Sequence, residues 1–228
     1  MAQRVSDQRF AASKHRYTDP RTGERYIGVT SVVGSFDTGD KLGAGAGAAV
    51  KLVKQGIDYR AEWNEKKNLG NRVHGYAQLW IEGRSADVLD SDAPQMNAFR
   101  QFINDYKPEW IEVERAVVSS LGYGGRFDAI AYFDGCFWLL DFKTGKPYKF
   151  ELMLQLAAYR YMDGMIVYDE EGWAKDLEPM PVVDKCAGLY LTADGYQLVE
   201  VDADEDALVL FNHLLAVKNG YSRMEKSL

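Results

Sequence analysis

GGRFDAIAYFDGCFWLLDFK, residues 124–143, carries the strongest structural signal in this chain. Asp134-Gly135 lies between aromatic residues, and this pattern predicts a two-residue type I′ turn that joins two antiparallel strands. The run is otherwise apolar and aromatic, yet it keeps the acids Asp128 and Asp141 and the amine of Lys143. Burying such groups costs free energy unless a partner neutralises them. The hairpin therefore contains a candidate site.

The turn determines which residues of the two strands face each other. Phe133 pairs with Cys136, and counting outward from that pair sets Asp128 directly opposite Asp141. Alternation from the turn makes them a non-hydrogen-bonded pair, with Cβ atoms roughly 4.5 to 5 Å apart on one face. Lys143 comes two residues later and points to the same face.

Like charges directly opposite each other destabilise a sheet, so this pair of acids needs a cation. Mg²⁺ or Mn²⁺ prefers carboxylate oxygens and keeps sites for water and for a phosphate oxygen. Lys143 can then offset negative charge that develops on a reacting phosphate. The pattern thus favours a metal-dependent phosphodiester-cleaving site. Two simpler readings remain open: an ion pair between Lys143 and an aspartate, or a one-residue slip of the register.

Composition limits the class of protein. The chain has 228 residues, of which 46% are hydrophobic, which is enough for one sizeable core. No apolar run approaches the roughly 18 residues of a membrane span, and no signal peptide is apparent, so we expect a cytoplasmic protein. Two cysteines exclude an iron–sulfur cluster held by four cysteines of this chain. The net charge of −7 argues against bulk attraction to nucleic acid, although a nuclease remains possible.

Periodicity and turn signals predict helices mixed with a small set of strands, which indicates an α/β fold with a mixed sheet in one domain. The expected helices cover 60–82, about 94–106, 150–163 and a C-terminal helix that ends at Gly220, with an amphipathic segment closed by Gly56. The expected strands are two short ones within 16–34, one at 110–119, the hairpin, and two around 193–195.

Other polar residues are weak candidates when each is taken alone. Gln155 and Tyr159 are four residues apart and so share one helix face. His74 lies on an apolar helix, where a structural histidine is the commoner case. Glu112 and Glu114 alternate onto one strand face, and solvated strand acids are the simpler interpretation.

The order of these residues, however, is distinctive. The matching runs are His74, VERAV with Glu114, GRFD with Asp128, LLDFKTGK with Asp141 and Lys143, and QLAAY with Gln155 and Tyr159. In this order the chain resembles the RecB-like, Cas4-like branch of the PD-(D/E)XK nucleases. Within that branch it is most similar to the mitochondrial genome maintenance and phage-encoded exonucleases. The resemblance is dense over 70–163, includes VTSVVG, and does not extend to the C-terminal part.

The resemblance implies a restriction-endonuclease-like mixed β-sheet flanked by helices, in a single domain spanning 1–228. Its N-terminal strands and helices (1–110) would pack on a catalytic core (70–163), followed by C-terminal strands and a helix (180–220). It implies catalytic roles for Asp128, Asp141, Lys143 and Glu114, and Mg²⁺ or Mn²⁺ held by His74, Asp128, Asp141 and the Phe142 carbonyl. Some relatives carry a four-cysteine iron–sulfur cluster, which this chain cannot build.

The implied activity is DNA exonuclease action, from single-stranded ends, in recombination, repair or phage DNA processing. Gln155 and Tyr159 would hold DNA or the reacting water, and basic residues including Arg72, Arg126 and Lys146 would form a positive groove. A recombination or replication protein is a candidate partner, no membrane is involved, and a phage origin would place the enzyme in the host cytoplasm. The alternatives are a flap- or branch-specific endonuclease and a catalytically silent nucleic-acid-binding accessory protein.

Overall fold

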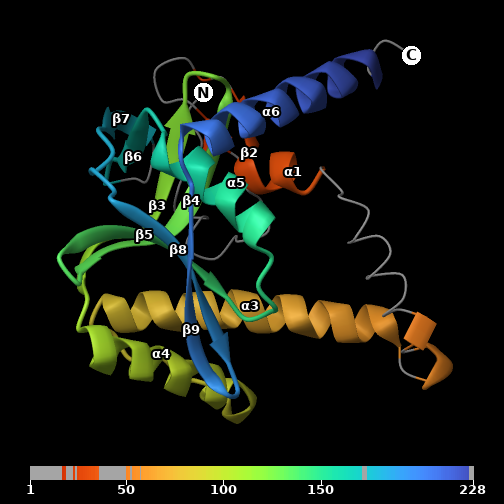
Figure 1. Cartoon of the computed structure of the whole chain (residues 1–228), viewed down its shortest axis with the longest axis vertical. Helices are drawn as coiled ribbons and strands as arrows, with labels where there is room; N and C mark the ends of the chain where they lie inside the picture. The colour runs from red at the N-terminus through yellow and green to blue at the C-terminus, as the bar shows by residue number, and fades with distance from the viewer. Residues whose placement is uncertain are drawn as a thin grey trace.

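The computed structural model describes residues 17–18, 23, 25–35, 50–51, 53–56, 58–170 and 174–225. A mixed β-sheet forms the centre of the molecule, and helices cover both of its faces (Figure 1). The α/β, restriction-endonuclease-like fold class expected from the sequence is confirmed. The main strands are β3 (Glu109–Ser119), β4 (Tyr123–Phe133), β5 (Cys136–Lys143), β6 (Gly164–Tyr168), β7 (Ala174–Glu178), β8 (Lys185–Thr192) and β9 (Gly195–Val201).

These strands follow the order β7-β6-β3-β4-β5-β8-β9 across the sheet. Neighbours along this order are antiparallel except β5 and β8, which are parallel. Two short strands, β1 (Tyr17–Thr18) and β2 (Arg25–Gly28), form the expected antiparallel pair, and β2 also runs parallel to the start of β4. The hairpin β4–β5 therefore lies in the middle of the sheet, where both of its faces are buried.

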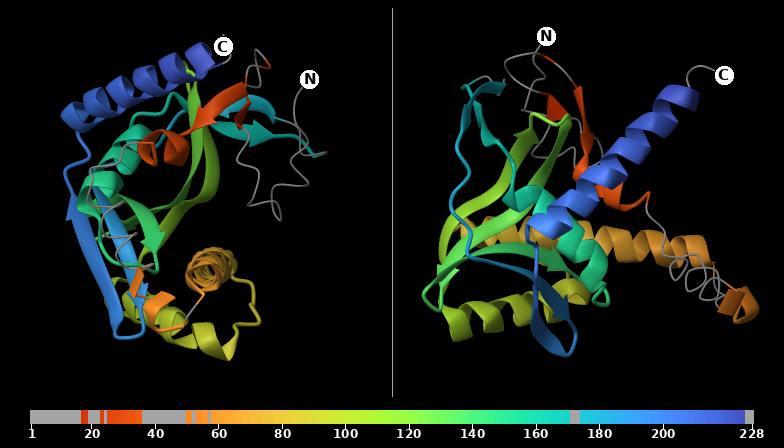
Figure 2. Two further views of the ribbon diagram at one scale, coloured as in Figure 1. Left: turned by 90° about the vertical axis from the view of Figure 1, so that its right-hand side faces the viewer. Right: turned by 45° about the horizontal axis from the view of Figure 1, so that its top comes forward.

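Two helical layers enclose the sheet, as the views in Figure 2 make clear. The helices α1 (Val29–Val33), α5 (Lys149–Arg160) and α6 (Glu205–Glu225) pack on one face and share a core with Ile130 and Leu139. The helices α3 (Tyr59–Ile81) and α4 (Ala93–Tyr106) cover the other face, against Leu140 and Phe142. No described helix is both long and apolar enough to cross a membrane.

The hairpin forms as the sequence predicts. Asp134 and Gly135 have φ values of 50° and 75°, and a type I′ turn needs positive φ at both positions. The expected register holds from Phe133–Cys136 to Ala129–Leu140. Beyond that pair the ladder between β4 and β5 ends, so the expected ladder pair of Asp128 with Asp141 does not form.

The ladder ends because the two strands take different neighbours. The start of β4 pairs with β2 at Tyr123 and Gly124, whereas β5 stays beside β8 as far as Lys143. The backbone N–H of Phe142 donates to the Asp128 carboxylate, at 2.5 Å, instead of to a carbonyl of β4. A fork between the two strands results, and Asp128 lies at its base.

Three secondary-structure expectations were wrong or incomplete. The VTSVV segment is helical rather than extended, because Val29, Val32 and Val33 pack into the core beneath α5 and α6. The strands β6 and β7 were not expected. The helix α6 continues through Gly220 to Glu225, since a glycine without positive φ need not end a helix. Gly56 has the left-handed φ of 72° expected of a helix end, but most of the segment before it lies outside the described residues.

Alanine substitution at two glycines should change stability in opposite directions. Gly220→Ala should stabilise the protein by about 0.5 to 1 kcal/mol, because helical Gly220 has nothing within 4 Å of its added Cβ and loses chain entropy on folding. Gly135→Ala should destabilise it by about 1 to 2 kcal/mol, because φ is 75° there. Urea denaturation of both variants measures the two effects, and a loss of stability in Gly220→Ala would contradict the helical assignment.

Candidate metal centre

Three acids lie on three adjacent strands around the fork: Glu114 on β3, Asp128 on β4 and Asp141 on β5. The ladder pairs on either side, Val113–Ala129 and Arg115–Phe127, place Glu114 opposite Asp128. Asp128 and Asp141 are both almost fully buried, and the charge of Asp128 adds to burial in raising the pKa of both Glu114 and Asp141. The acids of the site thus come together from three segments of the sheet.

Glu114 has an unusual backbone conformation. Its φ is 50°, in the left-handed region that non-glycine residues rarely occupy, and such strain costs on the order of 1 to 2 kcal/mol. The neighbouring acid Glu112 forms an ion pair with Arg115 at 2.9 Å, so of the two glutamates only Glu114 joins the group of acids at the fork. The distortion directs Glu114 toward Asp128 and interrupts the regular ladder of β3.

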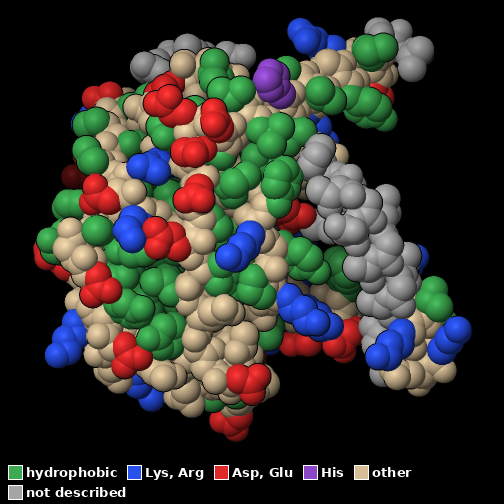
Figure 3. Space-filling view, viewed as in Figure 1, with side chains coloured by type: hydrophobic (Ala, Val, Ile, Leu, Met, Phe, Trp, Pro, Cys, Tyr) green, Lys and Arg blue, Asp and Glu red, His purple; other side chains and the backbone are tan. Residues whose placement is uncertain are grey.

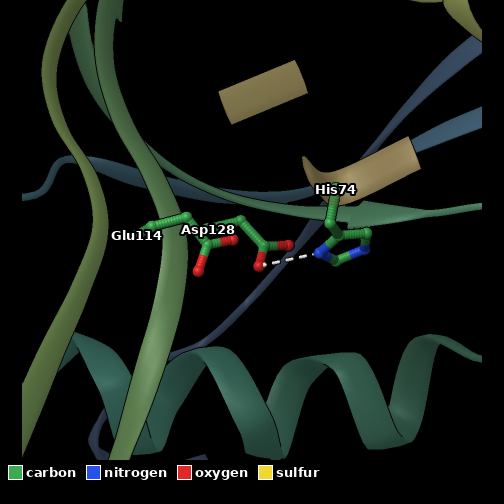
Figure 4. Close-up of side chains that lie close together, drawn as sticks. All are labelled: His74, Glu114 and Asp128. Carbon is green, nitrogen blue, oxygen red and sulfur yellow. Dashed lines mark ion pairs between the residues drawn. The ribbon is translucent and has the colours of Figure 1, made fainter. Parts of the chain in front are cut away.

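His74 reaches the same place from α3, as Figure 4 shows together with Glu114 and Asp128. Its Nδ1 lies 3.2 Å from Asp128 Oδ1, and its Nε2 lies 2.6 Å from the carbonyl oxygen of Phe142. One ligand atom from each of His74, Glu114 and Asp128 falls within 4.8 Å of the others, so this group could hold a metal ion. The Phe142 carbonyl, a further expected ligand, faces the same histidine.

Asp141 lies beside this group rather than in it. Its Oδ1 accepts a hydrogen bond from Gln155 Nε2 at 2.7 Å, and its Oδ2 forms an ion pair with Lys143. Gln155 Oε1 in turn lies 3.5 Å from Lys143 Nζ. The ion pair that the sequence left open is therefore present, together with Gln155 from α5. A joint role of Asp141 and Asp128 as metal ligands stays a prediction.

Tyr159 packs next to this arrangement, one turn after Gln155 on α5. A Cβ atom added at Gly125 would lie 2.3 Å from a ring carbon of Tyr159, so only glycine fits beneath the ring. Tyr190 of β8 is paired in the ladder with Lys143 and was not expected near the site. Parallel pairing between strands so distant in sequence leaves no local signal that could have identified it.

The ionisation of the site reflects this crowding. Burial opposes the charge on His74, but the adjacent Asp128 outweighs burial and raises the pKa of His74 to about 9. Burial and the charge of Asp128 raise the pKa of Glu114 to about 7. Burial likewise raises the pKa of Asp141 despite Lys143, whereas His74 and Lys143 hold the pKa of Asp128 below its usual value against burial. Without a metal, the histidine is therefore the group that neutralises Asp128.

The basic residues expected to form a groove are mostly engaged within the chain. Arg126 lies 3.6 Å from Glu114, and Arg72 binds the buried Asp92 at 2.6 Å and also Glu65. Lys146 is exposed. In Figure 3, acidic and basic side chains are interspersed over the visible face without a continuous basic stripe. DNA binding by Arg72, Arg126 and Lys146 stays a prediction, and Arg72 has a structural role that does not need DNA.

The aromatic residues suggested for base stacking divide into two groups. Trp63 and Tyr148 are 64% and 53% exposed, so their rings are accessible. Tyr76 and Trp80 pack in the core between α3, α4 and the sheet. Accessible stacking surfaces therefore occur on α3 and in the loop before α5.

Comparisons with known proteins add little. No protein family matches the chain, and no curated protein matches it. Among solved structures, the one titled "Crystal structure of SSO0001" is 17% identical, with a TM-score of 0.31 over 55% of this chain and 56% of that chain. This chain thus spans little more than half of that structure, and so low a score supports no conclusion about function.

The raised pKa values predict how stability depends on pH. A group with a raised folded-state pKa binds more protons when folded, so the free energy of unfolding falls as pH rises. The stabilising contribution of Glu114 should be complete below about pH 4.5 and should be lost as the pH rises through about 7. The stabilising contribution of His74 should be complete below about pH 6.5 and should be lost as the pH rises through about 9. Together they should lower the free energy of unfolding by roughly 1 to 3 kcal/mol.

Denaturant melts of the metal-free protein between pH 5 and 9.5 would measure this slope. His74→Gln should flatten it above pH 6.5, whereas His213→Gln, at an exposed position of α6, should leave it unchanged. Equal slopes in His74→Gln and the unaltered protein would contradict the ion pair with Asp128.

Proposed function

We propose that this protein is a Mg²⁺- or Mn²⁺-dependent DNA exonuclease of the RecB-like branch of the PD-(D/E)XK nucleases. It hydrolyses phosphodiester bonds from single-stranded ends, in recombination, repair or phage DNA processing, and acts in the cytoplasm. The observation that carries the proposal is the convergence of His74, Glu114 and Asp128, from a helix and two strands, to within 4.8 Å of one another at the fork.

The donor set fits a divalent cation. Carboxylate and carbonyl oxygens suit Mg²⁺ and Mn²⁺, and these oxygens outnumber the single imidazole, a ligand type that Zn²⁺, Cu²⁺, Fe²⁺ and Ni²⁺ prefer. Asp141 Oδ2 is buried, and the ammonium group of Lys143 is its ion-pair partner. A buried carboxylate oxygen in this state still has capacity for a cation. His74, Glu114 and Asp128 would hold the metal, with Asp141 and the Phe142 carbonyl adjoining.

The surrounding side chains can bind and orient a phosphodiester. A bound metal ion would supply Lewis-acid activation of the phosphate and of water. Lys143 places a positive charge beside the acids, where negative charge grows during phosphoryl transfer. Gln155 bonds Asp141 and also approaches Lys143, so it holds both side chains in one orientation. Tyr159 and Gly125 keep α5 close to the fork, which fixes the position of Gln155.

The same geometry disfavours a protein that only binds nucleic acid. Three acids within one buried site repel phosphate. One of them, Glu114, also has a strained backbone conformation. A binding module would gain affinity by losing these acids. The free-energy cost of the clustered acids is offset if the site binds a cation before it binds phosphate.

Hydrolysis of end-labelled single-stranded DNA in the presence of Mn²⁺ tests the activity. The unaltered protein should release short products, and Asp141→Asn or Lys143→Ala should slow release by roughly 100-fold or more. Circular single strands should remain intact. Cleavage of circles would favour the branch- or flap-specific endonuclease, and a protein inert on linear DNA and RNA in both strand forms would contradict the nuclease assignment.

Metal binding can be measured separately from catalysis. Mn²⁺ should raise the melting temperature of the unaltered protein, because a ligand of the folded state stabilises it by mass action. Asp128→Asn should lose most of this shift. Asp134→Asn is the matched control: it changes an acid of the same hairpin to the residue that suits a type I′ turn equally well. An unchanged shift in Asp128→Asn would mean that Mn²⁺ binds elsewhere.

A further inference from the structure

A pocket of about 230 Å³ opens directly beside the site, on the side of Lys143 and Gln155. Its walls come from the C-terminal end of α1, the loop after β5, the first turns of α5 and Tyr190 of β8. These segments are far apart in the sequence and meet at the end of β5. None of the proposed metal ligands lines the pocket, so it is a separate space that shares Lys143 and Gln155 with the site.

We propose that this pocket binds the nucleoside of the nucleotide that carries the scissile phosphate. The inference rests on the proposed phosphodiester hydrolysis. The part of the substrate that the pocket would bind is an unpaired base with its sugar. The reacting phosphate would lie at the mouth, near Lys143, and the base and sugar would extend between α1 and α5.

The aromatic wall is the first argument for a nucleoside. Tyr148 is 53% exposed, yet it is the N-cap of α5 and its carbonyl accepts the N–H of Leu152 at 3.1 Å, which anchors the backbone while the ring remains accessible. A base that stacks on an anchored aromatic ring loses little further entropy from the protein side. Stacking of this kind tolerates any base, because every base has a π-face.

The charges around the pocket are the second argument. Two cations, Lys143 and Lys146, and one carboxylate, Glu151, lie on its wall. Lys143 is ion-paired with the buried Asp141, so that pair adds no net charge, and the charges of Lys146 and Glu151 balance each other. A carboxylate inside the pocket opposes a phosphate group, whereas it accepts hydrogen bonds from sugar hydroxyls and base N–H groups. Thr30 adds a hydroxyl, while Val33 and Leu152 supply apolar surface. This mixture fits a neutral, hydrogen-bonding, flat ligand better than it fits an anion.

Size is the third argument. At about 30 Å³ for each water molecule, 230 Å³ corresponds to roughly eight waters, which is comparable with one base and part of its sugar. The volume of the pocket therefore suits one unpaired nucleotide.

Isothermal titration of the metal-free protein with thymidine, thymidine monophosphate and inorganic phosphate tests the ligand. Thymidine and the monophosphate should bind with similar affinity, and phosphate alone should bind far more weakly. Tyr148→Ala should weaken binding by about 5- to 150-fold, and Tyr148→Phe should restore it, because the ring and not the hydroxyl stacks. Tyr221→Ala is the control, since it removes another exposed tyrosine, from α6 and outside the pocket.

Kinetics on single-stranded DNA provides the second readout. Tyr148→Ala should raise KM by a similar factor with a smaller effect on kcat, and Tyr221→Ala should change neither. Equal binding of phosphate and thymidine monophosphate, or an unchanged affinity and KM in Tyr148→Ala, would overturn the nucleoside pocket while hydrolysis itself persists. A protein that binds thymidine through Tyr148 but hydrolyses no nucleic acid would instead refute the proposed function.

Discussion

The separation of β4 from β5 after the pair Ala129–Leu140 is the constraint on which the site depends. A continued ladder would have used the Phe142 N–H for a backbone bond and left Asp128 and Asp141 as two acids in direct opposition. In the fork, the Asp128 carboxylate takes that N–H, and its other oxygen faces His74. The same opening admits α5, whose Tyr159 ring fits only because residue 125 is glycine. Backbone pairing, helix docking and the position of the acids are thus consequences of one change in strand partners.

The charges at the fork nearly balance within the chain. Glu114, Asp128 and Asp141 are accompanied by Arg126, His74 and Lys143, and each acid has a basic neighbour within ion-pair distance. This explains how the fold tolerates three acids in one site without a metal. A metal ion could replace part of this charge balance, because His74 neutralises Asp128 only while its ring is protonated. The two ring nitrogens of His74 face the Asp128 carboxylate and the Phe142 carbonyl. A divalent cation could then neutralise the same acids while His74 is uncharged, since the ligand atoms of His74, Glu114 and Asp128 already lie within 4.8 Å of one another.

Local signals in the sequence were sufficient for the hairpin, because an Asp-Gly turn sets register over short range. They were also sufficient for the long helices, whereas His74, Glu114, Gln155 and Tyr159 were weak candidates until the family resemblance joined them. Local signals failed where distant segments decide the outcome. The parallel pairing of β5 with β8 brings Tyr190 beside Lys143, and helix packing overrides the strand preference of Val32. Alternation along β3 could not reveal Glu114 either, because its left-handed backbone departs from the regular strand on which alternation depends.

The surface charge limits how such an enzyme could hold DNA. The chain carries a net charge of −7, and several of its cations are committed to internal partners, as Arg72 is to Asp92. Attraction through many phosphate contacts and counterion release requires an extended basic surface, which the face in Figure 3 lacks. If the protein binds DNA as proposed, the fork can add affinity through a bound cation, through Lys143 and through stacking on an accessible ring such as Tyr148. Such a distribution favours strand ends, because only an end delivers an unpaired nucleotide and its phosphate to one small site without wrapping the rest of the strand around an acidic body.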